Sequence, residues 1–208
     1  MNKIYYIGGS PCSGKSTIAE MIVEKYDFQY FKQDDYLEEY FNRGIQEGND
    51  VFKKVASFSK DEMWLRSPAQ LRDEEIALYQ IMFQYFLNDV STLPEDKPII
   101  AEGAGFMPRL LKEQGVDKNS CCYLVPTKEF QVEMYSKREW VAEYLSDCSK
   151  PEEAFKNWME RDFLFGIKVY QEAVDLGYES IIVDGRKSIA EIFATTEKIF
   201  GLGNHIIR

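Results

Sequence analysis

"YYIGGSPCSGKSTIAEMI", residues 5–22, joins an apolar run to an amphipathic run through a loop of small residues. The segment 3–9 has the composition of a short buried strand that ends in glycine. In the segment 15–26, apolar residues recur at the three- and four-residue spacing of a helix. The stretch therefore predicts a strand that leads through a glycine-rich loop into a helix.

The loop fits the pattern G-x-x-x-x-G-K-[ST], the Walker A motif or P-loop. Its glycines let successive backbone N–H groups point at phosphate oxygens, and the N-terminus of the next helix adds partial positive charge. Lys15 would reach the β- and γ-phosphates, and the Ser16 hydroxyl would ligate Mg²⁺. The alternative is an ordinary glycine-rich turn. The predicted nucleotide-binding residues are Gly9, Ser10, Pro11, Cys12, Ser13, Gly14, Lys15, Ser16 and Thr17.

Four further apolar runs have the length and flanking turns of buried strands, within 28–36, 97–103, 120–127 and 178–185. Helical segments separate them, including an amphipathic one over 71–90 and a terminal one near 188–200. Such alternation predicts an α/β fold, a five-stranded parallel sheet flanked by helices. We expect a single domain over 1–208, with a helical cap over about 37–90 and a helical lid over about 128–165.

The composition restricts the partners and the location. Acidic residues outnumber basic ones by 35 to 25, and the net charge of −10 repels a nucleic-acid backbone over most of the surface. No apolar run approaches a membrane span, and no signal peptide is recognised. The cysteines lack metal-site spacing, which predicts reduced thiols and a cytoplasmic protein. The amphipathic segment 71–90 fits either the core or an oligomer interface.

Two aspartates end the second predicted strand. In an open α/β sheet the ligand lies beyond the carboxyl ends of the strands, where a carboxylate can accept a proton from a substrate hydroxyl. We expect Asp34 to be this base and to contact the acceptor, and Asp35 to cap the next helix. The alternative is that both only cap.

Glu102 ends the third predicted strand, directly after the apolar run "PIIA". An unpaired charge that emerges from a buried strand is costly. A carboxylate at this place commonly holds Mg²⁺ through water, so Ser16 and Glu102 are the predicted metal residues. A purely structural salt bridge is the alternative.

Three motifs, "GGSPCSGKST", "KQDDY" and "IIAEG", resemble those of the P-loop kinases of small molecules and nucleosides, which include nucleoside, nucleoside monophosphate and shikimate-type kinases. The first two are also similar to the start of polynucleotide 5′-hydroxyl kinases and of zeta-toxin and chloramphenicol-phosphotransferase relatives. The resemblance implies ATP and Mg²⁺, with Asp34 as base and Glu102 serving the metal. Leu37 stands where polynucleotide kinases tend to have arginine, which argues against a nucleic-acid acceptor.

The resemblance also implies arginines on a mobile lid after the fourth strand, because phosphoryl transfer needs positive charge and exclusion of water. Arg138 and Arg161 are the candidates. Ion pairing on the surface with Glu139, Glu160 or Asp162 is the alternative.

After the last strand, Gly185 and Arg186 stand where related kinases place the adenine. A simple turn in which Ser188 caps the terminal helix is the alternative.

Arg66, Arg72 and Arg109 are the candidates for binding an anionic group of the acceptor, although exposed arginines are usually only solvated. The sequence thus predicts an ATP- and Mg²⁺-dependent kinase of a small hydroxyl- or phosphate-bearing acceptor. Two alternatives stay open: an NTP-binding regulator or slow NTPase, and a nucleic-acid 5′-hydroxyl kinase.

Overall fold

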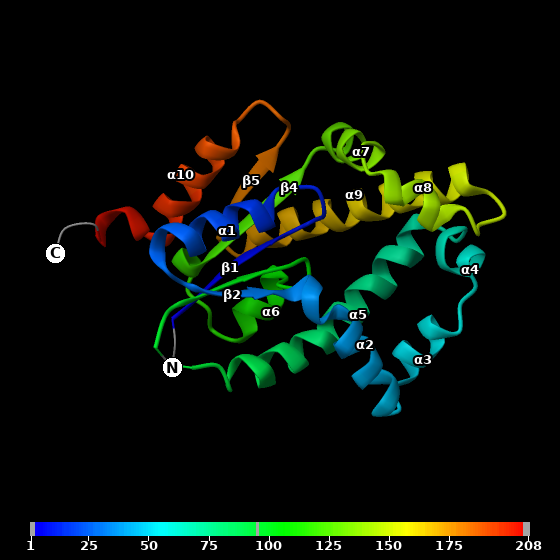
Figure 1. The fold of residues 1–208 in the computed structure, drawn as a ribbon, viewed down its shortest axis with the longest axis horizontal. Helices are drawn as coiled ribbons and strands as arrows, with labels where there is room; N and C mark the ends of the chain where they lie inside the picture. The colour runs from blue at the N-terminus through cyan, green and yellow to red at the C-terminus, as the bar shows by residue number, and fades with distance from the viewer. Residues whose placement is uncertain (1–2, 95, 206–208) are drawn as a thin grey trace.

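The computed structural model describes residues 3–94 and 96–205, and a single parallel sheet lies at its centre (Figure 1). The strand order is β2-β3-β1-β4-β5, and every neighbouring pair is parallel. The expected five-stranded α/β fold is confirmed. The strands are β1 (Ile4–Gly9), β2 (Gln29–Lys32), β3 (Ile99–Glu102), β4 (Cys121–Pro126) and β5 (Glu179–Val183).

Helices connect the strands. The α-helices are α1 (Lys15–Tyr26), α2 (Leu37–Gln46), α3 (Asp50–Ala56), α4 (Lys60–Trp64), α5 (Pro68–Val90), α6 (Pro108–Glu113), α7 (Lys128–Ser136), α8 (Glu139–Leu145), α9 (Pro151–Asp175) and α10 (Ile189–Phe200). The 3-10 helices are η1 (Gln33–Tyr36), η2 (Lys118–Ser120) and η3 (Leu202–His205). No helix in the described ranges combines the length and the apolarity that a membrane crossing requires.

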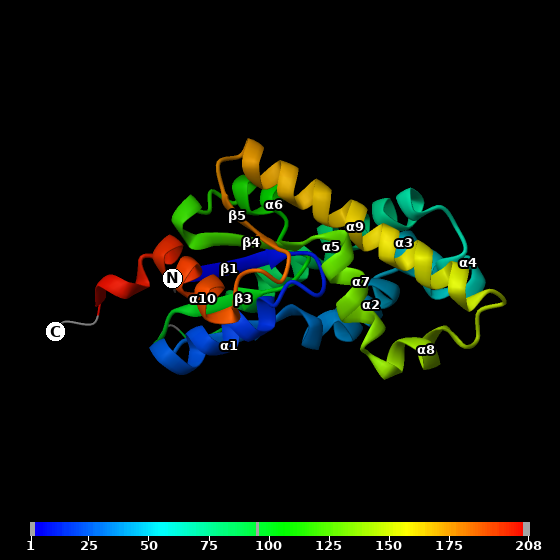
Figure 2. The ribbon, with the colours of Figure 1, turned by 90° about the horizontal axis from the view of Figure 1, so that it is seen from above.

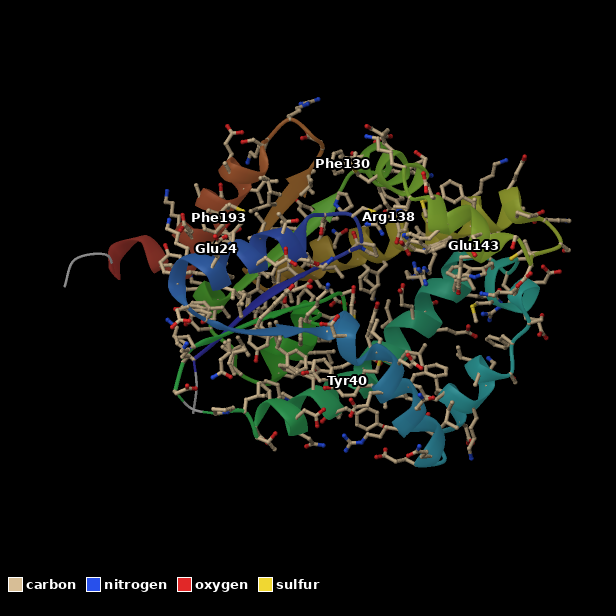
Figure 3. All side chains as sticks on the ribbon, viewed as in Figure 1. Glu24, Tyr40, Phe130, Arg138, Glu143 and Phe193 are labelled. Carbon is tan, nitrogen blue, oxygen red and sulfur yellow. The ribbon has the colours of Figure 1, made fainter. Side chains whose placement is uncertain are left out.

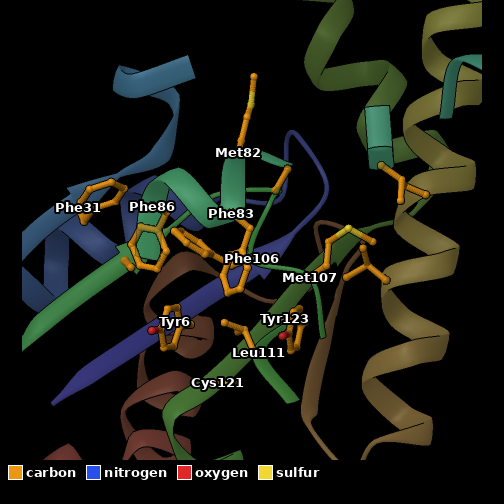
Figure 4. Close-up of a cluster of buried hydrophobic side chains, with 14 of the residues drawn as sticks. Tyr6, Phe31, Met82, Phe83, Phe86, Phe106, Met107, Leu111, Cys121 and Tyr123 are labelled. Carbon is orange, nitrogen blue, oxygen red and sulfur yellow. The ribbon is translucent and has the colours of Figure 1, made fainter. Parts of the chain in front are cut away.

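The two faces of the sheet carry separate apolar cores. Seen from above, α1 and α10 lie on one side of the strands and α6 and α9 on the other (Figure 2). Because side chains alternate along a strand, Tyr5 and Ile7 of β1 pack against α1 and α10, whereas Tyr6 packs on the opposite face. Helix α5 contributes Phe83 and Phe86 to that second face (Figure 4). The amphipathic segment 71–90 is thus part of the core.

Parallel register brings three strand ends together at one edge of the sheet. Glu102, the last residue of β3, lies beside Ile7 of β1 and Lys32 of β2. The loop after β1, the start of η1 after β2, and the end of β3 are therefore neighbours. Two long helical connections, α2–α5 and α7–α9, extend from the sheet on the same side as this edge (Figure 1).

The second strand ends earlier than the sequence predicts. Gln33 leaves the strand and is fully buried, and its Oε1 accepts a hydrogen bond from the Gly105 backbone N–H at 2.7 Å. A Cβ at Gly103 or Gly105 would collide with the Gln33 side chain, so only glycine fits there. This close approach turns the chain into η1 and fixes the two aspartates beside the loop after β3.

The expectation that Asp35 caps the next helix is wrong. Helix α2 has Tyr36 at its N-cap position, and no side chain accepts a hydrogen bond there. Asp34 and Asp35 lie instead in the first turn of η1, and both are exposed. The tight 3-10 turn moves the helix start past both aspartates, which leaves both carboxylates open to solvent.

The α2–α5 and α7–α9 segments touch each other at their outer ends. Trp64 of α4 stacks on Trp158 of α9 with ring centroids 4.7 Å apart, and Asn157 Nδ2 donates to the Trp64 carbonyl at 3.0 Å. The Asp61 carboxylate accepts from the Ser149 backbone N–H at 2.7 Å. Ring stacking and hydrogen bonds thus join the two helical segments.

Candidate functional site

The loop between β1 and α1 presents open backbone donors. Gly14 adopts φ 83° at the N-cap of α1, and no side chain caps this helix or places acid in its first turn. The first N–H groups of a helix lack partners inside the helix, and its dipole favours negative charge there. An anion at this position would therefore meet the positive end of the α1 dipole and its first N–H groups.

Lys15 is held inside this loop. Its Nζ donates to the Ser10 carbonyl at 2.8 Å and lies 3.5 Å from Ser13 Oγ, and the residue is only 9% exposed. Burial lowers the pKa of the Lys15 ammonium, while the charges of Glu102 and Asp34 act to raise it. A buried ammonium is costly without a negatively charged partner, so an anion such as a phosphate at this loop would stabilise the charge of Lys15.

Ser16 and Glu102, the two predicted metal residues, are in direct contact. Ser16 Oγ donates to Glu102 Oε1 at 2.9 Å, and Tyr30 OH donates to the same oxygen at 3.1 Å. Burial raises the pKa of Glu102, against the opposing effect of Lys15. No cluster of three or more metal-ligating side chains occurs among the residues described. Because Mg²⁺ is typically bound by one or two protein oxygens together with phosphates, this pair fits that ion.

Asp34 lies at the same edge of the sheet. The charge of Asp34 acts to raise the pKa of Lys15. Burial is the main cause that raises the pKa of Tyr79 well above its usual value, and the charges of Glu75 and Asp34 add to it. The carboxylate is exposed, in contrast to the buried Glu102. The two acids therefore offer different chemistry: one is open to a substrate, and the other is enclosed beside Ser16.

A cavity of about 430 Å³ opens beside the loop, on the side of α7 and α10. Its lining includes Cys12, Ser13, Gly14, Phe130, Met134, Arg138, Val183, Gly185, Lys187, Ile189 and Ile192. Figure 3 shows Arg138 and Phe130 on this side of the molecule. The Arg138 guanidinium lies 4.8 Å from the Tyr135 ring centroid. Gly185 and Arg138 therefore line the same cavity as Cys12, Ser13 and Gly14 of the loop.

Arg186 is directed away from this cavity. Its side chain is 89% exposed and pairs with Asp184 at 3.3 Å. Ser188 caps α10 in a capping box with Glu191, as the simpler alternative for this turn predicts.

Arg161 is enclosed by carboxylates. Its Nη2 lies 2.6 Å from Asp162 Oδ1, and its Nη1 lies 3.3 Å from Glu75 Oε1. Asp162 is fully buried and also accepts from Tyr135 OH at 2.9 Å. Although burial acts to lower it, these charges raise the pKa of Arg161 above its usual value. The Arg161–Asp162 pair exists, but it is a buried pair and not a surface one.

The three arginines predicted to bind an acceptor anion lie apart. Arg66 makes two bonds to Glu74, at 2.8 and 2.7 Å, beside a second cavity between α2 and α5. Arg72 pairs with Asp73 at 2.7 Å. Arg109 lines a third cavity, with residues of α5, α6 and α9.

Three residues of this region escaped the sequence reasoning. Gln33 positions η1, Tyr30 orients Glu102, and Glu75 is the second partner of Arg161. The glycines after Glu102 were a signal for close packing against a neighbouring residue. Nothing in the local pattern marks Glu75, because its partner lies on another helix.

Comparison with known proteins gives a likeness of fold. No family model matches the sequence, and no curated protein matches it either. A shikimate kinase from Bacteroides thetaiotaomicron superposes with a TM-score of 0.52, at 13% identity and over 97% of both chains. The chain has the P-loop kinase fold. TT1252 from Thermus thermophilus matches with the same TM-score of 0.52, at 14% identity and over 97% of both chains.

A shikimate kinase from Acinetobacter baumannii matches with a TM-score of 0.45, at 14% identity, over 100% of this chain and 96% of that one. In this chain "GGSPCSGKST" runs from the end of β1 through the turn into the start of α1.

Proposed function

We propose that the protein transfers the γ-phosphoryl group of ATP to a hydroxyl or phosphate of a small-molecule acceptor, with Mg²⁺. The observation that carries this proposal is the meeting of Lys15, the Ser16–Glu102 pair and Asp34 at one edge of the sheet. An anion site, a metal pair and an open carboxylate are the parts that phosphoryl transfer to an acceptor requires.

Each residue has a role in this reaction. Lys15 and the N–H groups of the loop bind the β- and γ-phosphates, and the cavity beside Arg138 and Gly185 receives the nucleoside of ATP. Ser16 and Glu102 would hold Mg²⁺, which when bound neutralises charge on the phosphates. Arg138 lies on the loop side and stabilises charge that develops during transfer.

The transfer to a hydroxyl needs one base, which takes up the proton that the acceptor loses. Asp34 accepts the proton of the acceptor hydroxyl as the new oxygen–phosphorus bond forms, and the bond to ADP breaks. The α2–α5 segment acts as the acceptor-side cap and the α7–α9 segment as the lid. Their contact through Trp64 and Trp158 supports the exclusion of water from the reacting groups.

The proposal is tested with Mg·ATP and a pool of nucleosides, nucleotides, sugars, hydroxy acids, aminoglycosides and 5′-hydroxyl oligonucleotides. Mass spectrometry reports any species that gains a phosphoryl group, with Lys15→Met as the control without transfer. A product made only by the wild type supports the kinase. ATP that is bound and slowly hydrolysed with no product favours a regulator or NTPase, and a phosphorylated oligonucleotide favours the nucleic-acid alternative.

A further inference from the structure

A further cavity, called here the lid cavity, lies where α7 and α8 meet the start of α9, away from the sheet (Figure 2). It has a volume of about 430 Å³, within the range of small-molecule sites. Arg138 lines both the lid cavity and the cavity that is proposed to receive the nucleoside of ATP. A ligand in the lid cavity would therefore meet a side chain of the phosphoryl-transfer site.

The walls of the lid cavity are mostly apolar. Val141 and Leu145 of α8 are buried and belong to one apolar cluster with Tyr135 of α7, and Phe155 of α9 packs against it. Walls of this kind bind an apolar chain or ring by removing its surface from water. The apolar lining consists of Tyr135, Val141, Ala142, Leu145, Pro151 and Phe155.

The rim of the lid cavity carries unpaired positive charge. Arg138 and Lys156 are both exposed, and neither forms an ion pair within the part of the chain that the structure describes. The nearby Lys137, by contrast, pairs with Glu133. Glu152 is the one acid of this lining, so cations outnumber acids here, although the whole chain has a net charge of −10. The charge of the lining favours an anion.

Arg138 is held at this place only by aromatic rings. Its guanidinium lies 4.8 Å from the ring centroid of Tyr135 and 6.0 Å from that of Trp140. At an exposed site such contacts are weaker than a charge-assisted hydrogen bond to a carboxylate or phosphate. An anion in the lid cavity and a nucleotide in the neighbouring cavity would therefore compete for the same guanidinium.

We propose that the lid cavity binds a small amphipathic anion, an apolar chain or ring that ends in one carboxylate, and that this anion draws Arg138 away from the nucleotide. The apolar body lies against Tyr135, Val141 and Phe155, and the carboxylate meets Arg138 and Lys156. The ligand is a free small molecule, because a chain with a net charge of −10 is repelled by an anionic lipid surface. Only the effect on the nucleotide rests on the proposed function.

The test of binding uses three probes with the same alkyl chain: octanoate, 1-octanol and octylammonium. Isothermal titration calorimetry measures the Kd of each. Ala142→Trp fills the cavity from an exposed position of its lining, and Val174→Trp adds the same bulk at an exposed site of α9 outside it. Lys156→Gln removes one charge of the rim, and Lys198→Gln removes one from the exposed surface of α10.

Octanoate is expected to bind the wild type, 1-octanol about three- to fivefold more weakly, and octylammonium most weakly. Ala142→Trp should weaken octanoate by about tenfold or more and Lys156→Gln by about three- to fivefold, while Val174→Trp and Lys198→Gln stay within about twofold. Because Lys156 is exposed, its variant keeps the test decisive if Ala142→Trp fails to fold. No binding of octanoate, equal binding of all three probes, or binding that neither cavity variant changes would overturn the site.

The effect on the nucleotide is measured separately. Octanoate should raise the Kd for Mg·ATP by about threefold, and Mg·ATP should raise the Kd for octanoate by the same factor, because coupling between two sites is reciprocal. In Arg138→Ala this coupling should disappear, while the alkyl chain still binds. Octanoate that binds the cavity and leaves the Kd for Mg·ATP unchanged would overturn the competition for Arg138. If the wild type binds no Mg·ATP, the proposed function fails, and the probe series still decides the lid cavity.

Discussion

Ser16 Oγ donates to Glu102 Oε1 at 2.9 Å, although the two residues are 86 positions apart in the chain. The contact joins the first turn of α1 to the end of β3, and Tyr30 from β2 donates to the same carboxylate oxygen at 3.1 Å. One helix and two strands of the sheet thus hold the Ser16–Glu102 pair beside Lys15. The two oxygens that are proposed to hold Mg²⁺ therefore already lie together in this structure.

Glu102→Gln tests this metal pair. The amide keeps the shape of the buried side chain but binds Mg²⁺ weakly, so the Mg²⁺ concentration for half-maximal activity should rise by about tenfold or more. Glu24→Gln, on the exposed surface of α1, is the matched control and should leave it unchanged. An Mg²⁺ titration of ATP turnover measures both. An unchanged Mg²⁺ requirement in Glu102→Gln would show that the carboxylate is structural only.

Asp34→Asn tests the base. The two aspartates of η1 are both exposed, and only the first is assigned to the acceptor proton. Asp34→Asn should lower kcat by about 10²- to 10⁴-fold and leave the Kd for ATP unchanged, while Asp35→Asn should retain activity. Steady-state kinetics and equilibrium ATP binding separate the two effects. Equal losses in both variants would point to a general effect of charge at η1.

Arg138→Ala tests the positive charge beside the loop. Arg138 lines the nucleotide-side cavity, whereas its neighbour Lys137 is 60% exposed and pairs with Glu133. Removal of one preorganised charge at a reacting group costs about a hundredfold in kcat, which is the loss expected for Arg138→Ala. Lys137→Ala should behave as the wild type. If both variants kept full kcat, the charge would have to come from another residue.

Glu75 should make stability depend on pH. Burial raises its pKa from 4.5 to about 7, against the opposing effect of Arg161. The folded state therefore holds this proton more tightly than the unfolded state, and the contribution to stability falls as pH rises from about 4.5 to about 7. Glu75→Gln should match the wild type near pH 4 and exceed its unfolding free energy by up to about 3 kcal/mol at pH 8.

Glu74→Gln should show the opposite sign. Hydrogen bonds from Arg66 lower the pKa of Glu74, so its ionised form stabilises the fold at neutral pH. This contribution is lost as pH falls through the lowered pKa, and Glu74→Gln should be destabilised at pH 7 and not in acid. Urea unfolding of the three proteins across pH measures both trends. If the wild type instead became more stable than Glu75→Gln as the pH rises, the charge of Arg161 would outweigh burial in setting the pKa of Glu75.

The elements of the fold were predictable where local pattern decides them. The helix expected over 15–26 has these bounds in the structure, because Gly14 starts it and Asp27 adopts the left-handed conformation at its end. The helix expected over 71–90 begins three residues earlier, at Pro68, because Ser67 caps it. The expected strands are all present, and β2 is cut short where Gln33 packs against Gly103 and Gly105.

The placement of charges was not predictable in the same way. Arg161 is adjacent to Asp162 in sequence, but its second partner, Glu75, comes from α5, and the pair is buried only because α5 packs on α9. Arg186, a predicted nucleotide-binding residue, has an exposed side chain that pairs with Asp184. Such pairings depend on contacts between elements distant in the chain, for which hydrophobic periodicity carries no signal.

The most direct measurement follows the γ-phosphorus of ATP by ³¹P NMR, with the wild-type protein, Mg²⁺ and the pool of candidate acceptors. The account predicts a new phosphoester resonance that grows in equal amount with ADP, with little inorganic phosphate, and its loss in Asp34→Asn. Inorganic phosphate that equals ADP, with no phosphoester from any acceptor, would contradict transfer to an acceptor and identify a hydrolase or a nucleotide-dependent regulator.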